Sequence, residues 1–246
     1  PDWITGPMTP EVQATALGGT VDGVLAEQIA LPATGVVKIP EHLTFEEAAT
    51  LPCAGVTAWY AQFVGGHILP GDTVLLLGTG GVSMFSLQFA KMAGARVILT
   101  SSSDEKLERA RALGAYHVIN YRRQPEWQNA VLDLTDGRGA DHAVEVGGPD
   151  TLNKTLQAVR VGGSISLMGV LTGFTANLST VSILHKNIKI QGTYVGSVAM
   201  FEAMNRAIAL HRMTPVVDRV FSFDDAVAAL KYLQSGNHFG KVVITL

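Results

Sequence analysis

The residues with the clearest capacity for chemistry are the glycines of the segment 78–83, which reads Gly-Thr-Gly-Gly-Val-Ser. An apolar run precedes this segment and another follows it, as expected for a buried strand, a tight turn and a helix. Gly78 permits the turn, and Gly80 lacks the Cβ that would keep a pyrophosphate away from the backbone. The N–H groups that open the helix attract such an anion. The segment therefore predicts a site for a phosphate-bearing ligand, against the alternative of a turn that binds nothing.

The elements around this turn alternate between strand-like and helix-like patterns from residue 71 onward. Strands that are apolar on both faces and alternate with helices predict an α/β protein with a parallel, doubly wound sheet, a Rossmann fold. The predicted strands are 73–77, 96–99, 117–120, 142–146, 164–168 and 188–194, and the predicted helices between them are 81–93, 104–113, 125–134 and 150–159. After the sheet we expect a helix at 198–211, an extended piece at 216–221, a helix at 224–234 and a strand at 241–246.

The part of the chain before the sheet gives weaker signals. Residues 24–31 and 35–40 have extended patterns, and we expect them to join the strands at the end of the chain in a second, mostly β unit. Thr44 and Glu47 have the spacing of a capping box, and Pro52 is placed to start a longer helix.

Composition limits the class of protein. The 246 residues are 47% hydrophobic with a formal charge of −3, which predicts a soluble globular protein without the basic surface that nucleic acid requires. A single cysteine excludes an internal disulfide framework and fits a reducing compartment, so we expect a cytoplasmic protein. No apolar run reaches the roughly 18 residues of a membrane span.

Several motifs occur in an order that resembles the medium-chain dehydrogenase/reductase superfamily, which includes zinc-type alcohol dehydrogenases and quinone oxidoreductases. The first is Leu-Pro-Cys-Ala-Gly-Val-Thr-Ala at 51–58, and the glycine turn follows it. The others are Ser-Ser-Ser-Asp-Glu-Lys at 101–106, His-Val-Ile-Asn-Tyr at 117–121, Glu-Val-Gly-Gly at 145–148 and Phe-Gly-Lys-Val-Val at 239–243. The resemblance spans nearly the whole chain, and it enters near the end of the family's GroES-like catalytic domain.

This resemblance implies a domain organisation and an activity. It assigns residues 1–55 to the last part of the GroES-like domain, 56–197 to the dinucleotide-binding domain and 198–246 to a return segment. The implied activity is hydride transfer between a nicotinamide cofactor and an alcohol or carbonyl, a quinone or an enone. Two alternatives stay open: a cofactor-binding fragment without turnover, and a zinc-dependent alcohol dehydrogenase whose other ligands lie upstream.

The family also implies which residues of this chain contact the cofactor. It assigns Thr57 to the nicotinamide and Lys241 to the phosphate or nicotinamide end. Each has a structural alternative, because Thr57 could bond its own helix backbone and Lys241 could be a solvated charge. The family assigns the pyrophosphate and the further course of the cofactor to Gly78, Gly80, Gly81, Val82, Gly147, Gly169 and Val170.

The end of the second strand bears on the choice between NADP(H) and NAD(H). NAD-binding proteins put a carboxylate about 20 residues past the glycine turn, and that position here falls at Ser101. Ser101 and Ser102 can donate to a 2′-phosphate, Lys106 can supply charge, and Tyr121 could flank the adenine ribose. The alternative is that Ser102 merely caps the following helix with Glu105, and the acidic residues in this turn weaken the case. The sequence favours NADP(H).

Zinc is not expected, although Cys53 stands where zinc-dependent relatives have a catalytic ligand. One cysteine without visible companions is a weak metal site, and it is better interpreted as a small buried thiol. The general acid is unknown; Tyr60, Tyr194 and His238 are candidates by residue type alone. The family's common dimer contact is the edge of the strand at 188–194, so a homodimer with a small-molecule substrate is expected.

Overall fold

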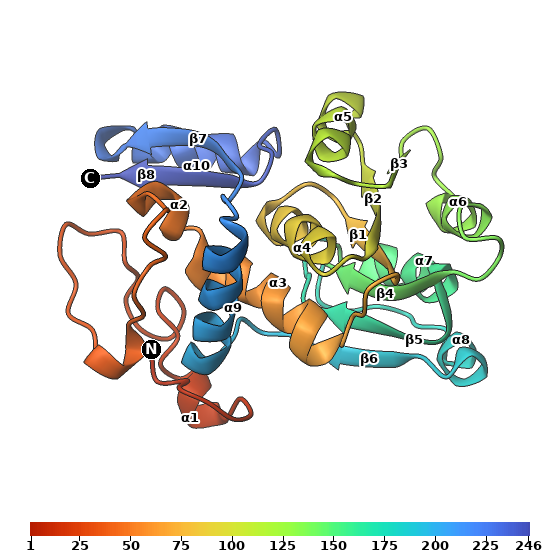
Figure 1. The fold of residues 1–246 in the computed structure, drawn as a ribbon, viewed down its shortest axis with the longest axis horizontal. Helices are drawn as coiled ribbons and strands as arrows, with labels where there is room; N and C mark the ends of the chain where they lie inside the picture. Colours follow the sequence, from red (N-terminus) through yellow and green to blue (C-terminus); the bar gives the residue numbers. More distant parts are fainter.

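The computed structural model describes all residues, 1–246, and contains a six-stranded sheet and a smaller unit beside it (Figure 1). The sheet order is β3-β2-β1-β4-β5-β6, and every neighbouring pair is parallel. The strands are β1 Thr73–Leu77, β2 Arg96–Ser101, β3 His117–Asn120, β4 Ala140–Glu145, β5 Val159–Leu167 and β6 Lys189–Gly192. The predicted parallel sheet is therefore confirmed.

Helices cover both faces of this sheet because its strands are apolar on both sides. Val74 and Leu76 of β1 pack with α4 and α5, while Leu75 and Leu77 pack with α6 and α7. The helices are α4 Gly81–Met92, α5 Asp104–Leu113, α6 Trp127–Asp133, α7 Pro149–Ala158 and α8 Thr180–Lys186. Alternation along one strand thus builds two cores, as a doubly wound fold requires. The sequence did not predict α8.

A third apolar cluster joins the sheet to the smaller unit. The helical segment predicted from Pro52 forms as a π-helix at Leu51–Gly55, α3 at Val56–Trp59 and a second π-helix at Tyr60–Gly65. It packs against α4 and against α9, Val198–His211, through Phe85, Phe89, Met204 and Ile208. Both connecting helices lie between the two units in Figure 1.

The end of the chain forms a strand, a helix and a parallel strand. These are β7 Val217–Ser222, a 3₁₀ turn Phe223–Asp225, α10 Ala226–Gln234 and β8 Lys241–Thr245. β7 and β8 pair with each other, as Figure 1 shows. The extended piece, helix and strand predicted for this segment are confirmed.

The strands predicted at 24–31 and 35–40 are wrong. This stretch contains only a 3₁₀ turn, Ala33–Gly35, and the side chains of Val24, Leu25, Ile29 and Val36 are exposed. An apolar run stays extended only where a neighbouring strand takes its backbone hydrogen bonds and a face is buried, and this chain offers neither here. The expected β unit reduces to the β7–β8 pair, and the domain boundaries at 55 and 197 stay predictions.

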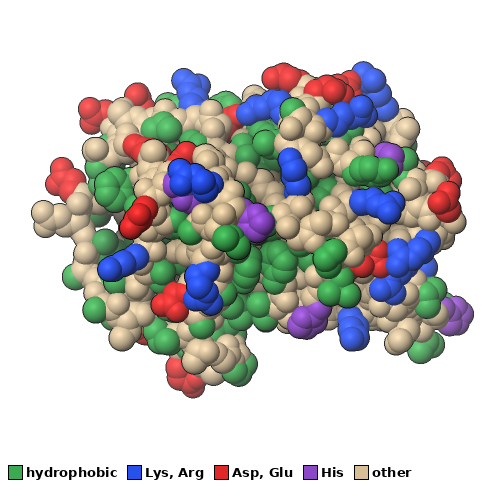
Figure 2. Space-filling model, in the orientation of Figure 1, with side chains coloured by type: hydrophobic (Ala, Val, Ile, Leu, Met, Phe, Trp, Pro, Cys, Tyr) green, Lys and Arg blue, Asp and Glu red, His purple; other side chains and the backbone are tan.

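The remaining short helices are α1, Pro10–Gln13, and α2, Phe45–Ala48. The capping box of α2 is confirmed, since Thr44 accepts from the Glu47 N–H and the Glu47 carboxylate accepts from the Thr44 N–H. None of the helices has the length and apolar character needed to span a membrane. Acidic and basic side chains are interspersed on the face in Figure 2.

Candidate cofactor site

The glycine turn joins β1 to α4 and leaves open space above its backbone. Gly78 has a φ of +72°, in the region that favours glycine, and its N–H donates to the Thr100 carbonyl at 2.8 Å. Gly80 is the extended residue before α4, and no side chain caps the N–H groups of that helix. A Cβ built on either glycine meets no heavy atom within 4 Å. A helix N-terminus and bare backbone thus face an open surface, which fits a pyrophosphate.

The next residues of the turn are fixed by packing. A Cβ on Gly81 would lie 2.5 Å from Lys241 Cδ and 3.2 Å from Ala54 Cβ, so a larger residue would displace the Lys241 side chain and press against Ala54. Val82 is half-buried between two core clusters. Ser83, in the place of the fingerprint's third glycine, is buried and donates to the Leu77 carbonyl at 2.7 Å. Serine therefore closes the turn onto β1.

The last part of the chain closes against the same turn. The Gly240 N–H donates to the Thr79 carbonyl at 2.9 Å, and Gly240 forms an isolated bridge with Gly80. Phe239 is buried in the core of the sheet and Arg109 lies over its ring at 4.2 Å from the centroid. These contacts bring Lys241 to the N-terminus of α4.

The end of β2 carries the residues predicted to recognise a 2′-phosphate. Ser101 is buried and Ser102 is half-buried. The residue that caps α5 is Ser103, whose Oγ accepts from the Lys106 N–H, so the alternative cap by Ser102 and Glu105 is wrong. Lys106 Nζ donates to the Gly236 carbonyl at 2.5 Å, which ties the first turn of α5 to the C-terminal segment.

Positive charge gathers between these two segments. Burial lowers the pKa of Lys106, with a further contribution from Arg109 and opposition from Asp218 and Glu105. Burial also lowers the pKa of His238, as do Lys106 and Lys241, and Asp218 again opposes them. The Asp218 carboxylate is already paired with Arg109 at 2.9 Å. The lowered pKa of His238 favours its neutral form, yet the cations Lys106, Arg109 and Lys241 still outnumber the carboxylates Asp218 and Glu105, a condition that attracts an anion.

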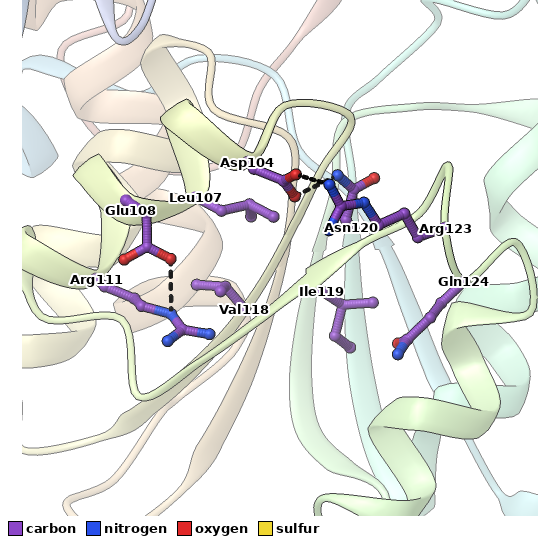
Figure 3. Close-up of a pocket in the computed structure, with 9 residues that line it drawn as sticks. All are labelled: Asp104, Leu107, Glu108, Arg111, Val118, Ile119, Asn120, Arg123 and Gln124. Carbon is purple, nitrogen blue, oxygen red and sulfur yellow. Dashed lines mark hydrogen bonds and ion pairs between the residues drawn. The ribbon is translucent and has the colours of Figure 1, made fainter.

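Asp104, the acidic residue next to the predicted phosphate site, is turned toward other partners. Its carboxylate accepts from Asn120 Nδ2 at 2.6 Å and pairs with Arg123, as Figure 3 shows. These residues line a groove of about 440 Å³ between α5 and β3 that none of the predicted site residues lines. The negative charge of Asp104 is thus compensated away from Ser101.

The loops after β4 and β5 lie against each other. Gly148 has a φ of +101°, and Gly169 lies so close to Val146 that a Cβ there would overlap the Val146 backbone. The Thr172 N–H donates to the Gly147 carbonyl at 3.1 Å. Gly147, Gly169 and the exposed Val170 are therefore brought together at the carboxyl end of the sheet.

Thr57 and Cys53 lie on the helical segment behind the turn. Thr57 is buried and its Oγ1 donates to the Cys53 carbonyl at 2.6 Å, so the backbone-bonding alternative is met. The Cys53 side chain is exposed, and the prediction of a buried thiol is wrong. The π-helical turn at Leu51–Gly55 buries Leu51, Ala54 and Gly55 and leaves Pro52 and Cys53 exposed.

The other candidates are dispersed. Tyr121 and Tyr194 are exposed, and the Tyr60 hydroxyl accepts from Gln191 Nε2 at 3.0 Å beside β6. No group of three or more His, Cys, Asp or Glu side chains could hold a metal ion. Cys53 alone does not make a zinc site, because catalytic zinc usually takes three protein ligands.

Comparison with known proteins matches residues 81–210 to the family model described as zinc-binding dehydrogenase. The chain belongs to this family. It is an oxidoreductase of the medium-chain alcohol dehydrogenase type, so the family and the fold implied by the resemblance are confirmed.

Three relatives illustrate the match. A zinc-type alcohol dehydrogenase-like protein of Schizosaccharomyces pombe is 46% identical over 251 residues, covering 100% of this chain and 72% of the relative. A crystal structure of a presumed alcohol dehydrogenase from Sinorhizobium meliloti 1021 aligns with a TM-score of 0.93 and 44% identity, covering 99% of this chain and 72% of that one. A crystal structure of an NAD-dependent alcohol dehydrogenase aligns with a TM-score of 0.87 and 34% identity. The alignment covers 94% of this chain and 67% of that one.

Two parts of this site were not predicted from the sequence. Gly240 and Lys106 contact segments more than 100 residues away, and no local sequence signal indicates such contacts. Glu145, a fully buried carboxylate at the end of β4, was given no role. The available signal was an acidic residue that ends an apolar strand just before two glycines.

Proposed function

We propose that this chain binds NADP(H) across the carboxyl edge of its sheet and supports hydride transfer to or from a small alcohol, carbonyl, quinone or enone. The uncapped N-terminus of α4 beneath the open backbone of Gly78 and Gly80 is the observation that carries this proposal. The pyrophosphate would bind there, with Lys241 beside it and the N–H groups of Gly81 and Val82 directed at it.

The two halves of the cofactor would extend to opposite sides of the turn. The sheet order reverses at β1, with β2 and β3 on one side and β4 and β5 on the other, and ligands bind at such a point. Ser101, Ser102 and Lys106 are on the β2 side, where the adenosine and its 2′-phosphate would lie. Gly147, Gly169 and Val170 are on the β4 side, with Thr57 behind them, where the nicotinamide would lie.

The preference for NADP(H) is supported by the charges at the end of β2. The strand ends in the neutral Ser101, and the charge of Asp104 in the following turn is compensated by Arg123, which leaves Glu105 as the opposing charge there. An ammonium group has three donors, so Lys106 can keep its bond to the Gly236 carbonyl and still donate to a phosphate. Because one structural relative is described as NAD-dependent, the test below includes NADH as the alternative cofactor.

The cofactor supplies the hydride chemistry, and the residues of this chain bind and orient it. The loops after β4 and β5 would hold the nicotinamide ring in one place and keep water from it.

The test is fluorescence titration of the purified chain with NADPH and with NADH, followed by turnover with aldehydes, quinones and enones. Saturable NADPH binding that is tighter than NADH binding, with oxidation of NADPH, is the expected result. Binding without turnover would instead favour a cofactor-binding module. Binding of neither cofactor would refute the proposal.

We further propose a homodimer that forms through β6. This strand is at the edge of the sheet, and Lys189, Gln191 and Gly192 on it are exposed. An unpaired strand edge is a template for pairing with a second copy. Light scattering on a size-exclusion column should give the mass of two chains, and a monomer at micromolar protein would refute it. A cytoplasmic location stays a prediction.

A further inference from the structure

The Glu145 side chain is fully buried beneath the loop that follows β4. Its Oε1 accepts from the N–H groups of Gly147 at 2.8 Å and Gly148 at 3.0 Å and from Thr151 Oγ1 at 2.7 Å. Its Oε2 accepts from Thr155 Oγ1 at 2.5 Å. A buried carboxylate is costly unless its oxygens are satisfied, and here hydrogen-bond donors surround both of them. Three of the four donors converge on Oε1, the oxygen that faces the glycine loop.

The backbone of Glu145 holds the second loop. Its carbonyl accepts from the N–H groups of Met168 at 3.1 Å and Gly169 at 3.0 Å, just beyond β5. Thr172 then bonds the Gly147 carbonyl through its N–H at 3.1 Å and its Oγ1 at 3.2 Å. One residue therefore connects the ends of β4 and β5, the two strands on the side of the turn away from β2.

We propose that Glu145 is a positioning residue that holds these two loops in the shape that receives the nicotinamide half of the cofactor. This inference rests on the proposed function. Consecutive glycines have many accessible conformations, so a loop built on Gly147 and Gly148 keeps one shape only if other groups fix it. The Glu145 carboxylate fixes it by accepting both N–H groups. A preformed loop lowers the cost of ordering the site when the ligand binds.

A purely structural role makes a different prediction. If Glu145 only satisfied donors at the start of α7, its loss would lower stability and affect every ligand of the site equally. If it positions the nicotinamide loops, its loss affects ligands that reach these loops and spares ligands that stop at the pyrophosphate. The compound 2′,5′-ADP contains the adenosine half alone and is the probe for this difference.

Glu145→Gln is the principal variant. The Thr155 hydroxyl can turn and accept from the new amide nitrogen, so the amide oxygen still faces the two glycines but without charge. Hydrogen bonds to a neutral acceptor are weaker than those to an ionised one. We expect calorimetric titration to give a Kd for NADPH that rises about tenfold, while the Kd for 2′,5′-ADP changes less than about twofold.

Thr155→Val is the matched control, because it removes the donor to Oε2 and leaves all three bonds to Oε1. It should lower stability to urea and leave the ratio of the two Kd values near that of the wild type. Thr151→Val removes one donor from Oε1 and decides the matter if Glu145→Gln does not fold; we expect its Kd for NADPH alone to rise about threefold.

The outcomes separate the two proposals. A wild type that binds NADPH, with equal changes for both ligands in Glu145→Gln or with no change in either, would overturn the positioning role and leave the proposed function intact. The same Kd ratio in Glu145→Gln and Thr155→Val would also overturn it. A wild type that binds neither ligand would overturn both.

Discussion

Replacing Lys106 is the most direct test of cofactor preference. Lys106 is in the first turn of α5, just after β2, and its ammonium donates to the Gly236 carbonyl in surroundings that also contain Arg109, Asp218 and Glu105. In Lys106→Ala, a 2′-phosphate would lose one charge-assisted hydrogen bond, worth about 1.5 to 3 kcal/mol. The Kd for NADPH should rise about 10-fold to 150-fold, and the Kd for NADH should change little.

Ser101→Asp tests the same site with the opposite change. A carboxylate at the end of β2 would repel the 2′-phosphate and accept from the ribose hydroxyls of NADH. Because Ser101 is buried, the new charge would also be poorly screened, so the two cofactors should separate further than in Lys106→Ala. NADH should bind more tightly and NADPH more weakly.

The control for Lys106→Ala is Lys91→Ala. Lys91 lies in the last turn of α4 and its Nζ donates to the Leu113 carbonyl at 3.3 Å, so it is also a lysine bonded to a backbone carbonyl. It is at the far end of α4 from the glycine turn, and its removal should leave both affinities unchanged. Equal losses of NADPH and NADH in Lys106→Ala, or a wild type that prefers NADH, would refute the reasoning.

Three further predictions concern the turn, the metal and acid stability. Gly80 is extended, with φ −76° and ψ −178°, so Gly80→Val should fold with an unchanged urea midpoint. The valine side chain would fill the space above the turn and weaken NADPH binding about a hundredfold or more. An affinity near that of the wild type, measured by calorimetry, would contradict this prediction. Because Cys53 has no metal-binding companions, elemental analysis of the dialysed chain should give far less than one zinc per chain, and about one zinc that is lost in Cys53→Ser would contradict this. Burial lowers the pKa of His142 to about 4, so the unfolded chain takes up a proton between about pH 6.5 and 4 that the folded chain does not. The stability that neutral His142 contributes is complete above about pH 6.5 and falls by roughly 3 kcal/mol toward pH 4, as urea unfolding at several pH values would measure; an identical pH slope in His142→Gln would contradict this.

Asp141 does not account for the same loss of stability. Burial opposes its ionisation, yet hydrogen bonds from Arg138, the Thr73 N–H and Arg160 hold the pKa of its carboxyl well below its usual range. A depressed carboxyl pKa gives stability that is present above the unfolded value and lost only as the pH falls below it. As the pH falls, the loss of stability due to His142 therefore comes first, and the loss due to Asp141 begins only below about pH 4.

The sheet could be predicted from the sequence because the apolar residues of each strand already indicate that both of its faces are buried. Val74 and Leu76 face one core and Leu75 and Leu77 the other, so the unbroken apolar run of β1 is explained only by a strand with two covered faces. The glycine turn was predictable for a similar reason, since Gly78 has a positive φ that few other residues adopt.

The N-terminal stretch failed for the opposite reason. The apolar residues of 24–40 would form strands if a partner strand buried them, but the pattern itself does not indicate whether such a partner is present. Val24 and Leu25 are apolar, as in a strand, but they are exposed because no neighbouring strand covers them. Propensity for β-structure depends on such neighbours far more than helix propensity does.

Only part of the candidate site could be predicted from the sequence, because three distant segments of the chain assemble it. Ser101 and Lys106 follow from the spacing to the glycine turn, but the bond of Lys106 Nζ to the Gly236 carbonyl spans 130 residues. That bond, with the Gly240 N–H on the Thr79 carbonyl, brings the C-terminal segment to the candidate site. Because Gly240 bonds the glycine turn and Phe239 is buried in the core of the sheet, the candidate site is assembled from the segment before β8 as well as from the turn after β1.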